Sequence, residues 1–230
     1  MSEHQHGEHG HHHDDRHQQH EHPTGEHEHG DRDFDRMATS WDDDPAKVER
    51  ARVVAELLTD QLTLGPSTSV FEYGAGTGLV SQHLAPHVGP ITVSDPSTGM
   101  RAAMAAKVES GTLPPGTPVW STDLDADPTP DARFDLVVTV QVLHHVQDLD
   151  RVLAGLAALT APGGHLAICD LEREDGSFHG DGFGGHHGFD RDDLASRIRA
   201  TGLDHVSFRH AYDLRKHDHD YPLFLAVASR

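Results

Sequence analysis

The sequence predicts an α/β fold in which a mostly parallel sheet is covered by helices on both faces. Strand-like and helix-like segments alternate over about 150 residues, which is the pattern of successive βαβ units. Residues 134–140 form a continuous apolar run, as expected for a strand that is buried on both faces. In such folds ligands bind in the loops at the carboxyl ends of the strands, so a functional site is expected there.

The ordered part of the chain is expected to begin near Phe34. Asp44 and Pro45 offer an N-cap followed by proline at the first helical position, and apolar residues then recur at helical spacing over 45–62. Gly65 and Pro66 end this helix. The elements expected after it are a strand at 69–73, a helix at 79–85, a strand at 91–94, a helix at 97–110, strands at 119–122 and 134–140, a helix at 149–159, a strand at 165–170, a helix at 191–201, and strands at 206–209 and 223–228.

Residues 1–33 differ from the rest of the chain. They hold eleven histidines among glycine, glutamine and acidic residues, and they lack the apolar residues that would offset the entropy of ordering, so we expect a disordered tail. Its imidazoles, with His11, His12 and His13 as the densest run, could loosely bind an adventitious divalent metal. The alternatives are a solubilising tail or an expression tag. The domain itself is expected to span 34–230, with 34–62 as an N-terminal cap and helix.

Charge and composition exclude several classes of protein. The formal net charge of −20 argues against nucleic acid as a partner, because phosphate backbones would be repelled. The single cysteine, Cys169, excludes an intrachain disulfide and a thiolate metal cage. The sequence shows neither a signal peptide nor an apolar run long enough to span a bilayer. We therefore expect a soluble, cytoplasmic protein.

The stretch VFEYGAGTG, residues 70–78, carries the first chemical signal. Gly74, Gly76 and Gly78 follow an expected strand and open an expected helix, the context in which glycine-rich loops bind nucleotide cofactors. A dinucleotide-binding fingerprint would need its third glycine at position 79, where Leu79 stands. A tight strand-to-helix turn without a ligand is the simpler alternative.

Two carboxylates bear on the cofactor class; Asp95 fits either class, and Glu72 separates them. Asp95 ends the second strand, 95 − 76 = 19 residues after Gly76, where a doubly wound fold places an acid that accepts hydrogen bonds from ribose hydroxyls. Glu72 directly precedes the glycines. A carboxylate there would oppose a pyrophosphate but would suit a ligand with a cationic amino group.

Four segments in register resemble the class I S-adenosylmethionine-dependent methyltransferases, in particular the small-molecule group that includes quinone-biosynthesis members. They are the acid-x-Gly-x-Gly-x-Gly motif at 72–78, the strand-ending Asp95, Asp123 after the third strand, and FDLV…LHHV at 134–146. The turn at 159–166 also resembles that family's entry into strand five. The resemblance covers roughly residues 34–230 and implies a Rossmann-like, seven-stranded sheet of order 3-2-1-4-5-7-6 with strand seven antiparallel.

The resemblance also implies a site for S-adenosylmethionine. The glycines would let the backbone approach the methionine portion, Glu72 would lie near its amino end, Asp95 would hold the ribose, and Asp123 would border the adenine. The full set of expected cofactor-binding residues is Glu72, Gly74, Gly76, Gly78, Asp95, Pro96, Asp123, Leu124 and Val140, with Met100 and Val142 as further pocket walls.

Residues that could act on a methyl acceptor follow strands four and five. His144 and His145 could take a proton at neutral pH, although a purely structural pair at a helix start is the alternative. Asp170 ends strand five and leads into a glycine-rich loop that is typical of a lid or substrate loop. His179, His186 and His187 in that loop could form a metal site with Asp170 or recognise a polar acceptor, or the loop could simply be solvated.

An aromatic segment precedes the first helix. Phe34, Met37 and Trp41 would cover the cofactor and acceptor cleft, or would serve only in packing. The function predicted is methyl transfer to an unidentified small-molecule acceptor by a monomer or homodimer. The alternatives are a metal-binding or metal-delivery protein on a methyltransferase-like scaffold and a nicotinamide-dependent oxidoreductase.

Overall fold

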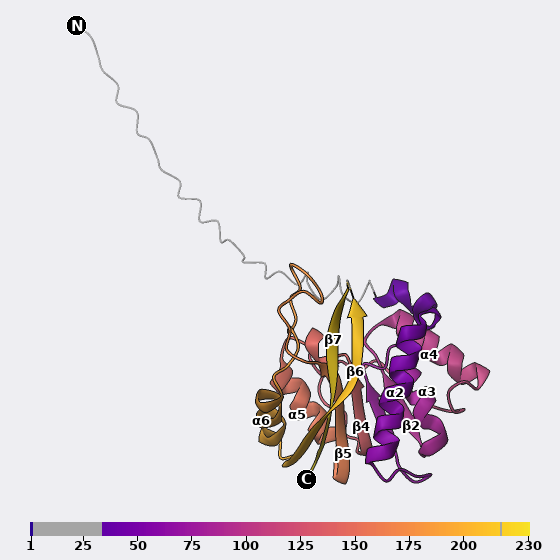
Figure 1. The fold of residues 1–230 in the computed structure, drawn as a ribbon. Helices are drawn as coiled ribbons and strands as arrows, with labels where there is room; N and C mark the ends of the chain where they lie inside the picture. The colour runs from indigo at the N-terminus through magenta and orange to yellow at the C-terminus, as the bar shows by residue number, and fades with distance from the viewer. Residues whose placement is uncertain (2–33, 217) are drawn as a thin grey trace.

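The computed structural model describes residues 1, 34–216 and 218–230, in which a seven-stranded sheet lies between two layers of helices (Figure 1). The strand order is β3-β2-β1-β4-β5-β7-β6, and β7 alone runs antiparallel to its neighbours. This confirms the predicted doubly wound, Rossmann-like sheet. The strands are β1 (Val70–Tyr73), β2 (Ile91–Ser94), β3 (Val119–Trp120), β4 (Phe134–Val140), β5 (Thr160–Leu171), β6 (His205–Lys216) and β7 (His219–Ser229).

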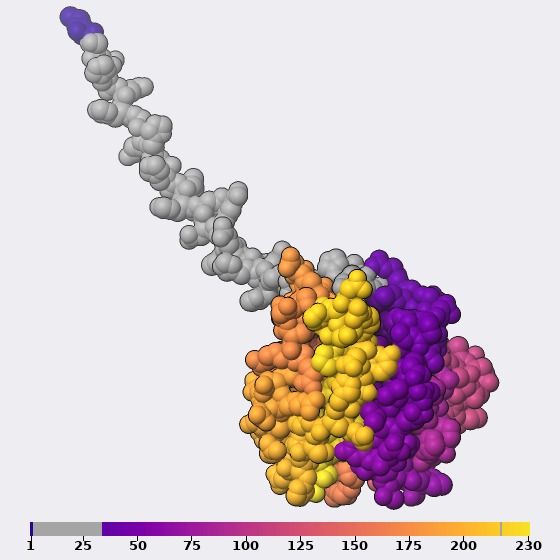
Figure 2. Space-filling view, viewed as in Figure 1, coloured from indigo at the N-terminus to yellow at the C-terminus, as the bar shows by residue number. Residues whose placement is uncertain are grey.

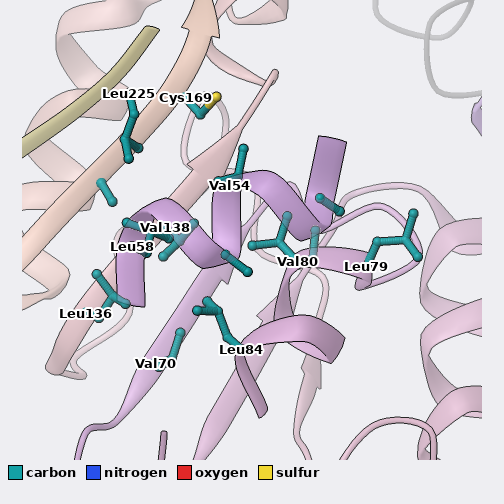
Figure 3. Packing of buried hydrophobic residues seen from close by; sticks show 14 of the residues in the cluster. Val54, Leu58, Val70, Leu79, Val80, Leu84, Leu136, Val138, Cys169 and Leu225 are labelled. Carbon is teal, nitrogen blue, oxygen red and sulfur yellow. The ribbon is translucent and has the colours of Figure 1, made fainter. Parts of the chain in front are cut away.

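Helices cover both faces of this sheet. The helices are α2 (Pro45–Gln61), α3 (Leu79–Leu84), α4 (Thr98–Ser110), α5 (Leu149–Leu159) and α6 (Arg191–Ala200), with 3-10 turns η1 (Ala38–Asp43), η2 (Ala85–His87) and η3 (Leu143–His145). Buried residues of α2, α3 and α4 share one apolar cluster, whereas those of α5 and α6 belong to a second. Figure 3 shows the first cluster, with Val54 and Leu58 of α2 lying near Val138 of β4.

The first long helix has the start that its capping residues predict. The Asp44 carboxylate accepts a hydrogen bond from the Ala46 backbone N–H at 2.9 Å, and Pro45 occupies the first turn. Val54 and Leu58 are completely buried, and each such side chain contributes about 1.5–3 kcal/mol. The space-filling view shows α2, in indigo, against the yellow carboxyl-terminal hairpin (Figure 2).

The last three strands are longer than the sequence predicted. The strand expected at 165–170 begins instead at Thr160, which pairs with Phe134 across an irregularity in the register. The strands expected at 206–209 and 223–228 extend into a hairpin that pairs as far as Lys216 and His219. Apart from the buried Ala211 and Tyr221, the added residues of this hairpin are exposed or half-buried and are held by ladder hydrogen bonds between β6 and β7, so the apolar pattern does not mark them.

The tail predictions lie outside the described residues, since residues 2–33 are not among them. This applies to the expected disorder of 1–33 and to His11, His12 and His13, and the domain boundary at residue 34 stays a prediction. No helix in the described part of the chain combines the length and the hydropathy needed to cross a bilayer.

Two segments meet at the carboxyl-terminal edge of the sheet. We call residues 34–43 the cap segment and residues 172–190, between β5 and α6, the β5–α6 loop. Figure 1 shows both at the end of the molecule toward which β6 points. This edge also carries the loops that follow β1, β2 and β4, so the predicted site residues gather there.

Candidate active site at the carboxyl edge of the sheet

The glycine loop, residues 74–78, turns sharply out of β1. Gly74, Gly76 and Gly78 all have positive φ, between 57° and 79°, a region that favours glycine. A Cβ at Gly74 would lie 2.3 Å from Val142 Cγ2, so Val142 closes one side of the loop as expected. A Cβ at Gly76 would meet only Trp41 Nε1 at 3.9 Å and Met100 Sδ at 4.0 Å. The backbone at Gly76 is therefore the part of the loop that a ligand could approach closely.

Asp95 joins the end of β2 to this loop. One carboxylate oxygen accepts a hydrogen bond from the Gly76 N–H at 2.8 Å, and the other accepts one from the Ser97 N–H at 2.9 Å. Its neighbour Pro96 is exposed, while Met100 is buried one helical turn further on. The structure thus brings together the glycines and the acid that the sequence paired by spacing alone.

Asp123 and Leu124 follow β3 and are fixed by a residue that the sequence analysis missed. The Tyr73 hydroxyl, at the end of β1, accepts a hydrogen bond from the Leu124 N–H at 3.1 Å and lies 3.3 Å from Asp123 Oδ1. Burial and the neighbouring Asp123 carboxylate raise the pKa of Tyr73. The sequence signal that could have identified Tyr73 is its position directly before Gly74, at the end of the strand that leads into the glycine loop. Val140, which ends β4, is partly buried against the core of the α2–α4 face.

Glu72 points beneath the loop rather than into an open cleft. Its carboxylate is buried and accepts hydrogen bonds from both the N–H (2.9 Å) and the hydroxyl of Ser81 in α3. Burial raises the pKa of Glu72 to about 7, against the effect of these hydrogen bonds. Its expected place near the amino end of a cofactor stays a prediction, and the observed partner is Ser81.

The cap segment is tied to the loops after β1 and β2 by two acids. Asp35 accepts hydrogen bonds from the Ser97 hydroxyl at 2.5 Å and the Gly99 N–H at 2.7 Å. Asp42 accepts one from the Thr77 hydroxyl at 2.5 Å and pairs with Lys107 at 2.6 Å. The structure therefore positions this segment beside the glycine loop.

Aromatic side chains of the cap segment pack against the turn that follows β4. The Phe34 ring lies 6.0 Å from Trp41 and 5.6 Å from His145, between ring centroids. Phe34 and Trp41 thus line this edge, as the sequence suggested. Met37 is 40% exposed, and its part in covering the edge stays a prediction.

Three histidines converge where β4 and β5 end. We call His144, His145 and His179 the histidine cluster: one ring nitrogen of each lies within 4.8 Å of the others. His144 Nδ1 lies 2.6 Å from Asp170 Oδ1, and both side chains are buried. Burial and the neighbouring His144 lower the pKa of His145 to about 3 and that of His179 to about 4. Both rings are therefore neutral at physiological pH.

The other two loop histidines do not join this cluster. His187 is exposed and its Nδ1 lies 3.2 Å from a Glu174 carboxylate oxygen. His186 packs against Phe189, and its backbone N–H donates to the His144 carbonyl at 2.7 Å. The predicted grouping of His179, His186 and His187 around Asp170 is therefore replaced by one in which only His179 reaches the His144–Asp170 pair.

The turn between β4 and the cluster is conformationally unusual. Gln141 has φ of 56°, a left-handed value that non-glycine residues rarely adopt, and its N–H donates to the Cys169 carbonyl at 2.7 Å. Such strain of about 1–3 kcal/mol persists where the surroundings enforce it, often at functional sites. Here it directs Val142 onto Gly74 and delivers His144 and His145 to the edge.

A glycine loop after β1, acids after β2 and β3, and a polar cluster after β4 and β5 define a nucleotide-cofactor-binding protein of the Rossmann-like class. The chain belongs to the methyltransferase-domain family, whose model matches residues 46–218. The family and fold inferred from the four motifs, that of the class I S-adenosylmethionine-dependent methyltransferases, are thereby confirmed.

Individual relatives agree with this assignment. An uncharacterised methyltransferase of Schizosaccharomyces pombe is 34% identical over 119 residues, which cover 49% of this chain and 42% of that protein. The ubiquinone biosynthesis O-methyltransferase of Coxiella burnetii is 26% identical over 144 residues, 61% of this chain and 60% of that protein. The chain thus spans about half the length of these curated relatives.

A solved structure shows the same fold. The magnesium protoporphyrin IX methyltransferase of Synechocystis PCC 6803, determined with bound SAH, superposes with a TM-score of 0.59 at 19% identity, covering 80% of this chain and 83% of that one. The nicotinamide-dependent oxidoreductase and the metal-delivery protein receive no support from these matches.

Proposed function

We propose that this protein transfers a methyl group from S-adenosylmethionine to a small polar acceptor bound between the glycine loop and the histidine cluster. The observation that carries the proposal is the continuity of these two features. Trp41 lies beside Gly76, and Phe34 contacts both Trp41 and His145. The residues expected to bind the cofactor and those expected to bind the acceptor therefore lie at the same carboxyl edge of the sheet, and the cap segment covers both.

The residues present fit the cofactor. Gly76 leaves its backbone approachable, Asp95 sits directly beside it, and Asp123 with Leu124 is held in place by Tyr73. When bound, S-adenosylmethionine would supply an electrophilic methyl group on a sulfonium: the acceptor's lone pair would bond to the methyl carbon as the carbon–sulfur bond breaks and the sulfur leaves as a neutral thioether. Asp95 would accept hydrogen bonds from the ribose hydroxyls, and Asp123 would border the adenine.

The acceptor side offers buried polar atoms that call for a polar ligand. Five buried side-chain atoms of the described residues have no hydrogen-bond partner, and three of them, Thr139 Oγ1, Asp170 Oδ2 and His179 Nε2, belong to β4, β5 and the loop after β5. Such atoms are costly unless they are satisfied by a ligand, water or ion. Thr139 belongs to β4, Asp170 to β5 and His179 to the β5–α6 loop, so all three surround the end of these strands.

The His144–Asp170 pair would take the acceptor's proton. The Asp170 carboxylate orients the imidazole by accepting the Nδ1–H, which leaves Nε2 as the basic nitrogen. The rest of the catalysis would come from holding the acceptor in line with the methyl group and from excluding water beneath the cap segment. The protein would act as a monomer or homodimer.

Titration calorimetry on the full chain tests the cofactor assignment. We expect S-adenosylmethionine and S-adenosylhomocysteine to bind and NADH not to bind. Asp95→Ala should weaken adenosyl binding at least tenfold with the circular dichroism spectrum unchanged. Asp135→Ala is the matched control. The Asp135 carboxylate also accepts a backbone N–H, that of Ser69, but Asp135 lies at the start of β4, away from the carboxyl edge of the sheet. The absence of adenosyl binding in the unmodified chain would overturn the proposal.

A further inference from the structure

We propose that the histidine cluster, His144, His145 and His179, is a binding site for a divalent transition-metal ion of the zinc class. One nitrogen from each ring already lies within 4.8 Å of the others. Two imidazole nitrogens on a tetrahedral zinc ion are about 3.4 Å apart, given Zn–N bonds of about 2.0–2.1 Å. Side-chain movements of about 1 Å would therefore close the three rings around an ion.

Asp170 supplies the outer support that metal-bound histidines need. His144 Nδ1 lies 2.6 Å from Asp170 Oδ1, so the imidazole donates its Nδ1–H and keeps Nε2 for an ion. With an ion bound, this nitrogen is a ligand and not a base, so metal binding and proton uptake at His144 are alternative states of the site. The same carboxylate oxygen accepts the Leu171 N–H at 2.8 Å, which fixes the orientation of the carboxylate. This is the carboxylate–histidine–metal arrangement that sets the tautomer and raises the basicity of a ligand.

His179 provides a second, independent indication. Its Nε2 is buried and has no hydrogen-bond partner among the described residues. The ring stacks on Phe183 with centroids 3.8 Å apart and an interplanar angle of 12°, so its orientation is set by packing. The His179 ring is thus held in place while its buried Nε2 has no hydrogen-bond partner in the described part of the chain. A metal ion bound to this nitrogen would supply the missing partner.

The donor set selects the class of ion. Three imidazoles suit zinc, nickel or copper, whereas calcium and magnesium require oxygen ligands. Burial favours the neutral imidazole, which is the form that binds metals. Three protein ligands leave a coordination position for water or for a polar acceptor, as in catalytic rather than structural zinc sites. The cluster also joins the β5–α6 loop to the turn after β4, so the ion would fix this loop.

Metal binding by the full-length chain tests the proposal, provided that the tail histidines are silenced. We would replace the eleven histidines of residues 1–33 by glutamine and measure zinc and cobalt(II) by equilibrium dialysis, together with the visible absorption of the cobalt form. The expected result is one tightly bound equivalent. His179→Ala should weaken binding at least tenfold, and Asp170→Asn should weaken it about 10- to 100-fold with all three ligands present.

His187→Ala is the matched control, because His187 lies in the same loop but is exposed and outside the cluster. It should leave the bound equivalent unchanged. A tail-silenced chain that binds no ion, or equal effects of His179→Ala and His187→Ala, would overturn the proposal. Circular dichroism and S-adenosylhomocysteine titration of the same samples separate loss of the ion from loss of the fold. They also separate failure of the metal site from failure of the proposed methyl transfer.

Discussion

His144 Nδ1 lies 2.6 Å from Asp170 Oδ1, which couples the turn after β4 to the end of β5 by a buried contact. The two residues are 26 positions apart in the sequence; His144 lies in the turn after β4, and Asp170 lies in the neighbouring strand β5. Because the pair is inaccessible to water, its effect on stability and on activity can be measured by changing one partner at a time.

Asp170→Asn keeps the shape of the side chain but removes its charge. We expect the free energy of unfolding to fall by about 1–3 kcal/mol, since the pair is buried. Methyl transfer should fall roughly 10²-fold, because His144 loses the carboxylate that orients its imidazole. Urea denaturation and a methyl-transfer assay measure the two effects. Asp175→Asn, at an exposed position of the β5–α6 loop, is the control; equal results for both variants would contradict this role for Asp170.

Glu72 predicts a specific dependence of stability on pH. Its folded pKa of about 7 is above the ordinary glutamate value of 4.5, so the folded state holds the proton more tightly than the unfolded state. The contribution of Glu72 is therefore fully present below pH 4.5 and is lost as the pH rises to about 7. This loss amounts to about 3 kcal/mol. Urea denaturation between about pH 4.5 and 8 measures the free energy of unfolding of the unmodified protein and of Glu72→Gln. The difference between these two free energies should change by about this amount over that range.

The control for this measurement is Glu109→Gln, which makes the same change at an exposed position of α4. A Glu72→Gln variant whose unfolding free energy parallels that of the unmodified protein at every pH would show that Glu72 does not titrate in this range.

Gly76→Ala tests whether the glycine loop is shaped for a ligand. Alanine at a φ of +57° should lower the free energy of unfolding by about 1–2 kcal/mol. Its methyl group should also weaken S-adenosylhomocysteine binding at least tenfold by occupying the approach to the backbone. Gly163→Ala is the matched control, because Gly163 has φ of +79°, lies at the start of β5, and has nothing within 4 Å of the place that a methyl group would take. It should lose stability similarly and bind normally; equal binding by both variants would argue against the assignment.

Gly184 and Gly185, adjacent in the β5–α6 loop, allow a test of how this loop packs against the turn after β4. A Cβ at Gly185 would lie 2.1 Å from the His144 carbonyl oxygen, whereas one at Gly184 would meet nothing within 4 Å. Gly185→Ala should therefore release the loop from the turn after β4, and Gly184→Ala should not. Amide hydrogen exchange at His186, whose N–H bonds to the His144 carbonyl, should quicken only in the first variant. Unchanged protection in Gly185→Ala would show that the loop tolerates the displacement.

Most of the fold could be predicted from the sequence because local signals agreed with it. Asp44 and Pro45 begin α2, and Asp190 caps α6 by accepting the N–H groups of Asp192 and Asp193. The pairing of Asp95 with Gly76 also followed from spacing, since a strand of this fold and its neighbour end at the same edge.

The parts that could not be predicted depend on contacts between distant segments. Which loop histidine would turn inward is set by the path of a glycine-rich loop that has no periodicity, so His179 could not be distinguished from His186 and His187. The Glu72 carboxylate is directed by strand alternation toward Ser81, nine residues later, and no local pattern marks that pair. Asp35 and Asp42 likewise accept hydrogen bonds from loop residues more than 30 positions away in the sequence.

The cap segment has a consequence for the chain that precedes it. Its first residue, Phe34, places its ring against His145, so residues 1–33 are covalently attached at the rim of the histidine cluster. An encounter between any of the eleven histidines in that stretch and the cluster is therefore intramolecular. The frequency of such an encounter is independent of protein concentration.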